Sequence, residues 1–155
     1  MKAAYYIAVA ATLLIALTTS CGNAGAQNDQ KKKTSEQKYV AELTSEQFSQ
    51  LVYDLNSGEG KYLGTKPAII DFTATWCGPC RSIAPILEEL SKEYADQIVI
   101  YKVDVDKCRD VAEAFGITSI PAILYIPLDG EPSMTIGARN KSKFQTEIDK
   151  ILLGK

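Results

Sequence analysis

Histidine is absent from the 155 residues of the chain. Its absence excludes nucleophiles activated by His, metal centres with His ligands, and a side chain whose ordinary pKa makes it a switch near neutral pH. Any reaction that the protein carries out must therefore depend on cysteines, carboxylates or lysines.

Basic residues are not in excess, since 17 Lys and Arg face 19 Asp and Glu for a formal net charge of −2. Nucleic-acid-binding domains are usually strongly basic, so we expect no nucleic-acid partner. The positive charges gather only at Lys31, Lys32 and Lys33. These lysines either solvate a polar segment or attract anionic lipid headgroups.

Cysteine is scarce, with four residues in the chain. This number is far too low for a small disulfide-dense scaffold. The length allows one ordinary domain of roughly 100 to 150 residues.

The apolar run at residues 3–17 contains no charge but is shorter than the roughly 20 residues that a membrane-spanning helix needs. Lys2 precedes it and a polar stretch follows. This arrangement is typical of a secretory signal, so we predict that residues 1–20 are a signal peptide and that the protein is exported.

Two processing sites compete after this segment. Residues 17–21, Leu-Thr-Thr-Ser-Cys, resemble a bacterial lipobox, although Thr18 stands where an aliphatic residue is usual. Ala24-Gly25-Ala26 offers a small-x-small cleavage site instead. We favour lipidation of Cys21, which would tether the mature protein to a membrane. Residues 21–38 are almost entirely polar and predict a flexible linker.

Residues 39–155 alternate between strand and helix patterns. We predict strands at 39–43, 68–73, 97–103, 120–126 and 133–136. Helices are predicted after the capping residue Thr44, from the Trp76 turn to about residue 95, and at 107–115 and 141–153. Asp129-Gly130 predicts the turn of a hairpin. This order indicates an α/β domain with one mixed five-stranded sheet and four helices on its two faces.

The motif Trp76-Cys77-Gly78-Pro79-Cys80 lies where the apolar strand at 68–73 ends and a helix begins. Two cysteines with this spacing in a first helical turn can form a disulfide and open again to a dithiol. The first cysteine faces unpaired backbone N–H groups and the positive end of the helix dipole, which favours the reactive thiolate. Pro79 is tolerated because its missing N–H has no helical partner in a first turn.

Several further motifs occur in a fixed order around this one. Ile70-Asp71-Phe72 precedes it and Pro85 follows it; the later motifs are the Val-Asp-Val-Asp run at 103–106, the Gly-Ile-Thr-Ser-Ile-Pro run at 116–121 and the Ile-Gly pair at 136–137. On these motifs residues 39–155 resemble the thioredoxin family, and with the export segment the chain resembles the periplasmic thioredoxins of Gram-negative bacteria. The resemblance implies the thioredoxin fold, thiol-disulfide exchange, and no cofactor besides a redox-active Cys77–Cys80 disulfide.

The resemblance also implies roles for single residues. Cys77 would attack the disulfide of a client protein, and the more buried Cys80 would resolve the mixed disulfide. Asp71, in an apolar strand, corresponds to the family's buried carboxylate, and its raised pKa would let it accept the Cys80 proton. Lys102 is either the lysine that accompanies this carboxylate or an ordinary exposed strand lysine.

Client binding is expected around the same cysteines. Ile120-Pro121 matches the family's cis-proline loop, which pairs with the client's backbone. An apolar rim is expected from Trp76, Gly116, Ile120, Gly137 and Ala138, with Gly78 and Pro79 of the motif beside it.

Three positions depart from the family's pattern or add to it. Thr73 stands where many thioredoxins have tryptophan, and Arg81 replaces a common lysine. Cys108 is an additional cysteine, which is either a small apolar core residue or a regulatory thiol.

Other functions remain to be weighed against a reductase. A metal centre built on Cys77, Cys80 and Cys108 lacks a fourth ligand, so we expect no metal. A non-catalytic binding subunit, and an exported oxidant or isomerase, are the alternatives. Gly-Pro between the cysteines resembles reducing thioredoxins, so we favour a reductase of protein disulfides. We expect it to be a monomer that a membrane electron donor recharges and that acts on mispaired disulfides or in cytochrome maturation.

Overall fold

The structure is a computed structural model that describes residues 39–58 and 60–155. The predicted signal peptide at 1–20, the lipidation site Cys21 and the linker at 21–38 lie outside the described residues. Among the described helices, none is both long and apolar enough to cross a membrane.

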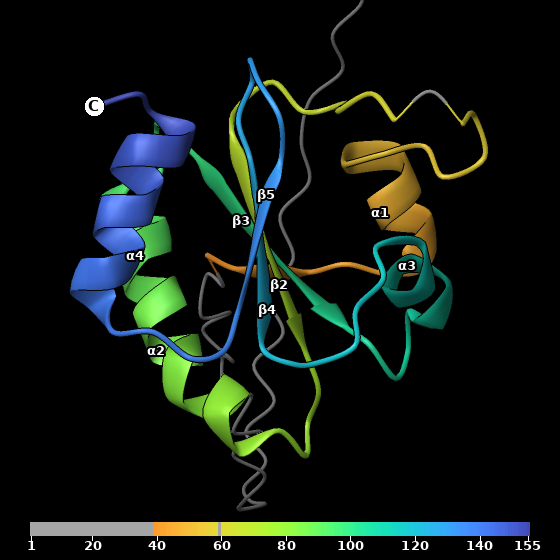
Figure 1. Cartoon of the computed structure of the whole chain (residues 1–155), viewed down its shortest axis with the longest axis horizontal. Helices are drawn as coiled ribbons and strands as arrows, with labels where there is room; N and C mark the ends of the chain where they lie inside the picture. The colour runs from red at the N-terminus through yellow and green to blue at the C-terminus, as the bar shows by residue number, and fades with distance from the viewer. Residues whose placement is uncertain (1–38, 59) are drawn as a thin grey trace, which may run out of the picture. The chain divides into compact units, whose positions relative to one another are not determined.

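A five-stranded mixed sheet forms the centre of the domain, with strand order β1-β3-β2-β4-β5 (Figure 1). The strands are β1 (Ala41–Glu42), β2 (Ala68–Thr73), β3 (Val99–Asp104), β4 (Ala122–Ile126) and β5 (Ser133–Ile136). β1, β3 and β2 are parallel neighbours, whereas β4 pairs antiparallel with both β2 and β5. The predicted fold class is therefore confirmed, although β1 has only two residues and is shorter than the expected 39–43 strand.

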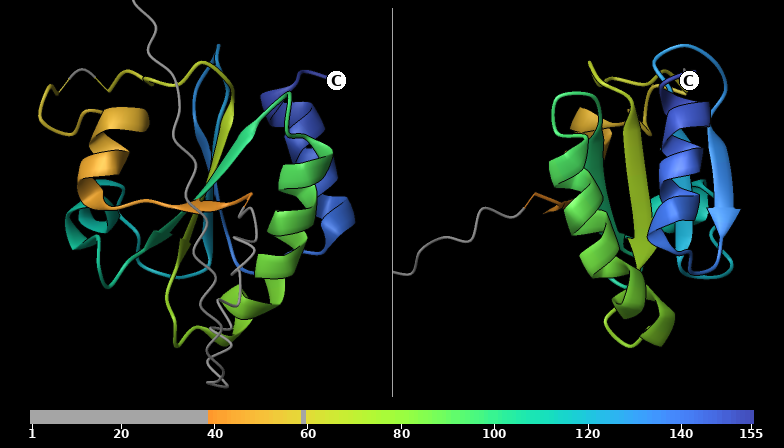
Figure 2. Two further views of the ribbon diagram at one scale, coloured as in Figure 1. Left: turned by 180° about the vertical axis from the view of Figure 1, so that it is seen from behind. Right: turned by 90° about the vertical axis from the view of Figure 1, so that its left-hand side faces the viewer.

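Two helices cover each face of the sheet (Figure 2). α1 (Ser45–Leu51) and α3 (Arg109–Ala114) lie on one face. α2 (Gly78–Glu93) and α4 (Lys141–Glu147) lie on the other, and α4 continues as a π-helical turn, η1 (Ile148–Leu152). Every residue of β2 is buried, because β2 has a strand on both sides and helices on both faces. The absence of alternation in its sequence predicted this position.

Local sequence signals fix several element ends. The predicted capping box is present, since Thr44 Oγ1 accepts from the Gln47 N–H at 3.2 Å and Gln47 Oε1 accepts from the Thr44 N–H at 3.0 Å. Asn140 caps α4 by accepting from the Lys143 N–H at 2.9 Å. Gly130 has a φ of +111° in the hairpin turn between β4 and β5, a conformation that glycine adopts without strain.

Candidate active site

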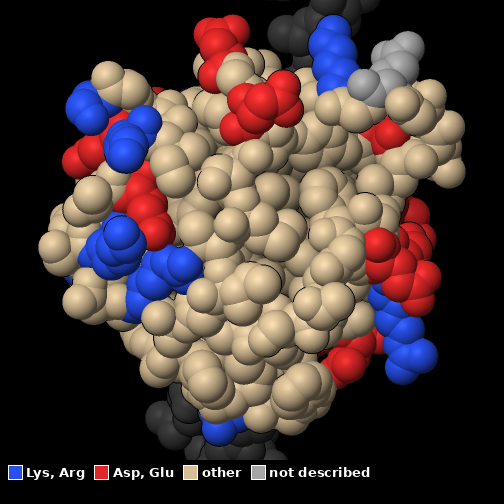
Figure 3. All heavy atoms as spheres, viewed as in Figure 1, with Lys and Arg blue, Asp and Glu red and all other residues tan. Residues whose placement is uncertain are grey.

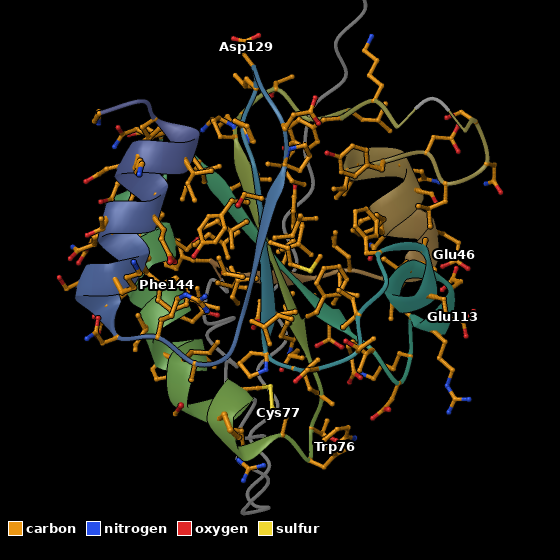
Figure 4. All side chains as sticks on the ribbon, in the orientation of Figure 1. Glu46, Trp76, Cys77, Glu113, Asp129 and Phe144 are labelled. Atoms are coloured by element: carbon orange, nitrogen blue, oxygen red, sulfur yellow. A yellow bond between two sulfur atoms is a disulfide. The ribbon has the colours of Figure 1, made fainter. Side chains whose placement is uncertain are left out.

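Ends of four strands lie together at one end of the sheet. Thr73 at the end of β2 is paired with Asp104 at the end of β3. Phe72 is paired with Ala122 at the start of β4, which in turn is paired with Ile136 at the end of β5. The loops that leave these ends carry nearly all the residues that the sequence singled out. In Figure 4 this end of the sheet faces downward, with Cys77 at the start of α2 and Trp76 just before it.

Cys77 and Cys80 form a disulfide with Cα atoms 5.3 Å apart. Cys77 is the N-cap of α2, and its Sγ accepts a hydrogen bond from the Cys80 N–H at 3.2 Å. In the reduced protein this donor and the helix dipole stabilise a thiolate at Cys77. Cys77 is 4% exposed and Cys80 2%. Cys80 is therefore only slightly more buried than Cys77 in the disulfide form.

Asp71 lies in the middle of β2 and is buried. Its Oδ1 has no hydrogen-bond partner. Burial raises the pKa of Asp71 from 3.8 to about 7, and the charge of Lys102 opposes this shift. A carboxylate with a pKa near neutrality and a free oxygen can accept a proton at physiological pH.

Lys102 is the direct neighbour of Asp71 across the β2–β3 pairing. Its ammonium, however, lies 2.9 Å from Glu42 Oε2 on β1, and no ion pair joins it to Asp71. The Lys102 side chain is 30% exposed. Lys102 thus acts on Asp71 through its charge. It is neither a direct partner of this carboxylate nor a fully exposed strand lysine. The sequence did not single out Glu42, because its place opposite Lys102 follows from the pairing of β1 with β3.

Trp76 is 66% exposed and lies beside the disulfide. Its indole Nε1–H donates to Asp106 Oδ2 at 2.8 Å. The Asp106 N–H in turn donates to Asp104 Oδ1 at 3.0 Å. The loop after β3 therefore holds the indole in a position that is open to solvent. The Asp-x-Asp spacing of this loop was the only sequence signal for Asp106.

The Ile120–Pro121 peptide bond is cis. Ile120 is half-buried and packs against Ala74, Cys77 and Cys80. The Gly137 N–H donates to the Pro121 carbonyl at 2.8 Å, which joins the β5–α4 loop to the cis-proline loop. Gly116 and Ala138 are exposed and Gly137 is half-buried.

The remaining motif residues are on the surface. Gly78 and Pro79 are exposed in the first turn of α2. A Cβ at Gly78 would meet only Arg81 Nη2, at 3.9 Å, so the backbone does not require glycine there. Arg81 Nη1 donates to the Thr75 carbonyl at 3.0 Å and thereby ties α2 to the loop before it.

Thr73 and Cys108 are both buried away from solvent. The Cys108 thiol is free, and it donates to the Leu43 carbonyl at 3.5 Å in the core on the α1 and α3 face. Within the described residues, no group of three or more Cys, Asp or Glu side chains is placed to hold a metal ion.

Comparison with known proteins identifies the thioredoxin family, which the sequence motifs resemble. Residues 39–150 match the family described as Thioredoxin. A thioredoxin of Borreliella burgdorferi is 47% identical over 107 residues, which cover 68% of this chain and 92% of that protein. Thioredoxin C-2 of Corynebacterium nephridii is 41% identical over 112 residues, or 72% of this chain and 94% of its own length.

A solved structure shows the same fold. The crystal structure of chloroplastic thioredoxin z superposes with a TM-score of 0.61 at 27% identity, over 72% of this chain and 93% of that one. With its Cys77–Cys80 disulfide at the start of α2, the chain belongs to the thioredoxin family of thiol-disulfide oxidoreductases.

Proposed function

We propose that the protein reduces disulfides of other proteins outside the cytoplasm. The observation that carries this proposal is the Cys77–Cys80 disulfide at the N-terminus of α2, on the sheet face where Asp71 is buried with a free oxygen. This arrangement supplies a stabilised thiolate, a second thiol three residues away and a proton acceptor.

The reaction begins with the reduced protein. The Cys77 thiolate attacks one sulfur of the client disulfide, so a Cys77–client bond forms and the other client sulfur leaves as a thiolate. The Cys80 N–H and the helix dipole stabilise Cys77 as a thiolate before the attack.

Resolution of the mixed disulfide requires a thiolate at Cys80. The Asp71 carboxylate takes the Cys80 proton, directly or through water, and the Cys80 sulfur then attacks Cys77 Sγ. The Cys77–Cys80 bond forms and the second client thiolate is released. Two electrons have passed from the dithiol to the client, and no histidine is needed for the proton transfer.

The surface around the disulfide suits an unfolded or looped client segment. In the view of Figure 3, mostly uncharged side chains cover the centre and lower part of the molecule, and charged groups lie at the margins, one basic group at the lower end among them. Trp76, Ile120 and the glycine-containing loops at 116 and 137 offer apolar contact with few charges to desolvate. Gly78, Pro79 and Ala138 extend this exposed surface.

Location outside the cytoplasm rests on residues 1–38. A signal peptide at 1–20 exports the chain to the periplasm, and a lipid on Cys21 with the linker at 21–38 holds the monomeric domain at the membrane. A membrane electron donor then regenerates the dithiol. Clients would be proteins with mispaired disulfides or cytochromes during maturation.

Single-turnover kinetics test the activity. The reduced protein is mixed with insulin, and the fluorescence of Trp76, the sole tryptophan, reports oxidation of the neighbouring dithiol. We expect rapid reduction of insulin by the wild type and none by Cys77→Ser. Failure of the reduced wild-type protein to reduce insulin would overturn the proposal.

A further inference from the structure

A buried chain of polar groups joins the sheet to the loop that follows β5. Tyr125 in β4 donates its hydroxyl to Glu147 Oε2 at 2.6 Å. Glu147 Oε1 accepts from Arg139 Nε at 3.2 Å, and Arg139 Nη1 donates to the Gly137 carbonyl at 2.6 Å. The Arg139 side chain is 15% exposed and the Glu147 side chain 11%, so this ion pair is largely removed from water.

Stability alone is a weak explanation for this pair. Taking both charges out of water costs free energy that their attraction only partly recovers, and apolar side chains of similar size often stabilise a core equally well. What the pair adds is a fixed orientation of the Arg139 guanidinium. Both Glu147 oxygens are engaged, one by Tyr125 and one by Arg139, with Lys143 Nζ at 3.8 Å from the second. The guanidinium is therefore held in one orientation, with its Nη1 directed at Gly137.

Gly137 is held from both sides of its backbone. Its N–H donates to the carbonyl of the cis residue Pro121 at 2.8 Å, and its carbonyl accepts from Arg139. Its φ of +95° lies in the left-handed region that other residues rarely adopt. Ile120, which precedes Pro121, packs against the two active-site cysteines. The chain of contacts thus runs from Tyr125 in the core to the loops beside the disulfide.

We propose that Arg139, oriented by Glu147 and Tyr125, is a positioning residue for client binding. It fixes the Gly137 carbonyl and so presents the Gly137 and cis-proline loops in the one arrangement that receives an extended client segment. This inference rests on the proposed protein-disulfide reductase function. A small disulfide that contacts only Cys77 needs no such surface, so Arg139 acts on the choice of substrate and not on the exchange chemistry.

Arg139→Met removes the guanidinium and keeps most of the side-chain volume. We expect its second-order rate constant with insulin to fall roughly five- to tenfold, because the client surface is no longer held in one arrangement. The rate constant with 5,5′-dithiobis(2-nitrobenzoate), a small disulfide, and the reduction potential should both stay at wild-type values. Arg139→Lys, which can reach Glu147 or Gly137 but cannot bridge both, should fall between the wild type and R139M.

The matched control is Lys141→Met. Lys141 is the first residue of α4, the helix that carries Glu147, and its ammonium pairs with Glu89 and Glu93 of α2. We expect K141M to react with both disulfides as the wild type does.

Loss of Arg139 alone leaves Glu147 buried without its main cation, which can unfold the protein. The double variant R139M/E147M replaces the pair with apolar side chains and provides a second test of the same loop. It should show the same selective loss with insulin. A wild-type ratio of the two rate constants in either folded variant overturns the inference, as does an equal loss with both disulfides. A wild-type protein that reduces only the small disulfide instead overturns the proposed function.

Discussion

The Lys102 ammonium pairs with Glu42 at 2.9 Å although Asp71 is its neighbour across the adjacent strand. Glu42, Lys102 and Asp71 share one row across β1, β3 and β2. Glu42 therefore draws the cation toward the sheet edge and leaves Asp71 Oδ1 without a partner. We therefore expect Glu42 to affect the protonation of Asp71 indirectly, through the position of the Lys102 ammonium.

Glu42→Gln should move the pH dependence of mixed-disulfide resolution to lower pH. Without the Glu42 carboxylate, Lys102 is free to approach Asp71, and a nearer positive charge lowers the pKa of a carboxyl group. Lys102→Met should move the profile in the opposite direction, because the Lys102 charge already lowers the pKa of Asp71. Stopped-flow measurement of the release of the second client thiolate between pH 5 and 9 gives both profiles.

The control for the E42Q and K102M variants is Lys107→Met, which removes the second cation on Glu42 but leaves the Glu42–Lys102 ion pair in place. Its profile should coincide with that of the wild type. Shifts of the same sign in E42Q and K102M would contradict the account.

Asp71→Asn should stabilise the oxidised protein at alkaline pH. Burial raises the pKa of Asp71 from 3.8 to about 7. The native state therefore binds this proton more tightly than the unfolded chain does. The resulting stability is fully present below pH 3.8 and is lost as the pH rises through about 7. Above that pH the native state holds a buried charge at a cost of roughly 4 kcal/mol.

Urea unfolding from pH 4 to 9 measures this effect. The wild type should lose stability across the interval and D71N should lose much less, with the two curves diverging as the pH rises. Parallel curves would show that Asp71 keeps an ordinary pKa. D71N should also slow the resolution step near pH 7, since the amide cannot accept the Cys80 proton.

Cys80→Ser should trap the mixed disulfide. The serine hydroxyl cannot displace a sulfur, so Cys77 attacks the client and the covalent complex persists. Non-reducing electrophoresis and intact-mass measurement detect the adduct, which dithiothreitol releases. Cys77→Ser is the paired control and should form none, and an adduct of similar yield in C77S would place the nucleophile at Cys80.

Cys108→Ala should leave the redox chemistry unchanged. The Cys108 thiol lies buried among the side chains of the α1 and α3 face, and burial raises its pKa, so it is a poor nucleophile. Loss of its sulfur should lower the free energy of unfolding by about 1 kcal/mol through the small cavity. A changed rate of insulin reduction at constant stability would instead assign Cys108 a functional role.

Sequence patterns predicted the order of elements and the local features well. The unbroken apolar run of β2, the capping box at Thr44 and the C-x-x-C motif at a strand-to-helix junction are all local signals. The π-helical turn after Glu147 and the shortness of β1 were not predicted, because both depend on packing against the rest of the domain.

Partners of charged side chains were the part that the sequence could not supply. The contacts of Lys102 with Glu42, of Trp76 with Asp106 and of Arg139 with Glu147 join different elements or loops. Their choice depends on strand register and side-chain direction, which periodicity does not encode. Arg139 was the least visible of these residues, since a lone arginine before a helix ordinarily indicates a solvated surface.

The reduction potential of the Cys77–Cys80 pair tests the central claim most directly. The protein is equilibrated with glutathione redox buffers, and the oxidised fraction is read from Trp76 fluorescence and from alkylation of free thiols. A protein-disulfide reductase should give a value near the roughly −270 mV of thioredoxin. A potential above about −180 mV, in the range of isomerases and oxidants, would contradict the account.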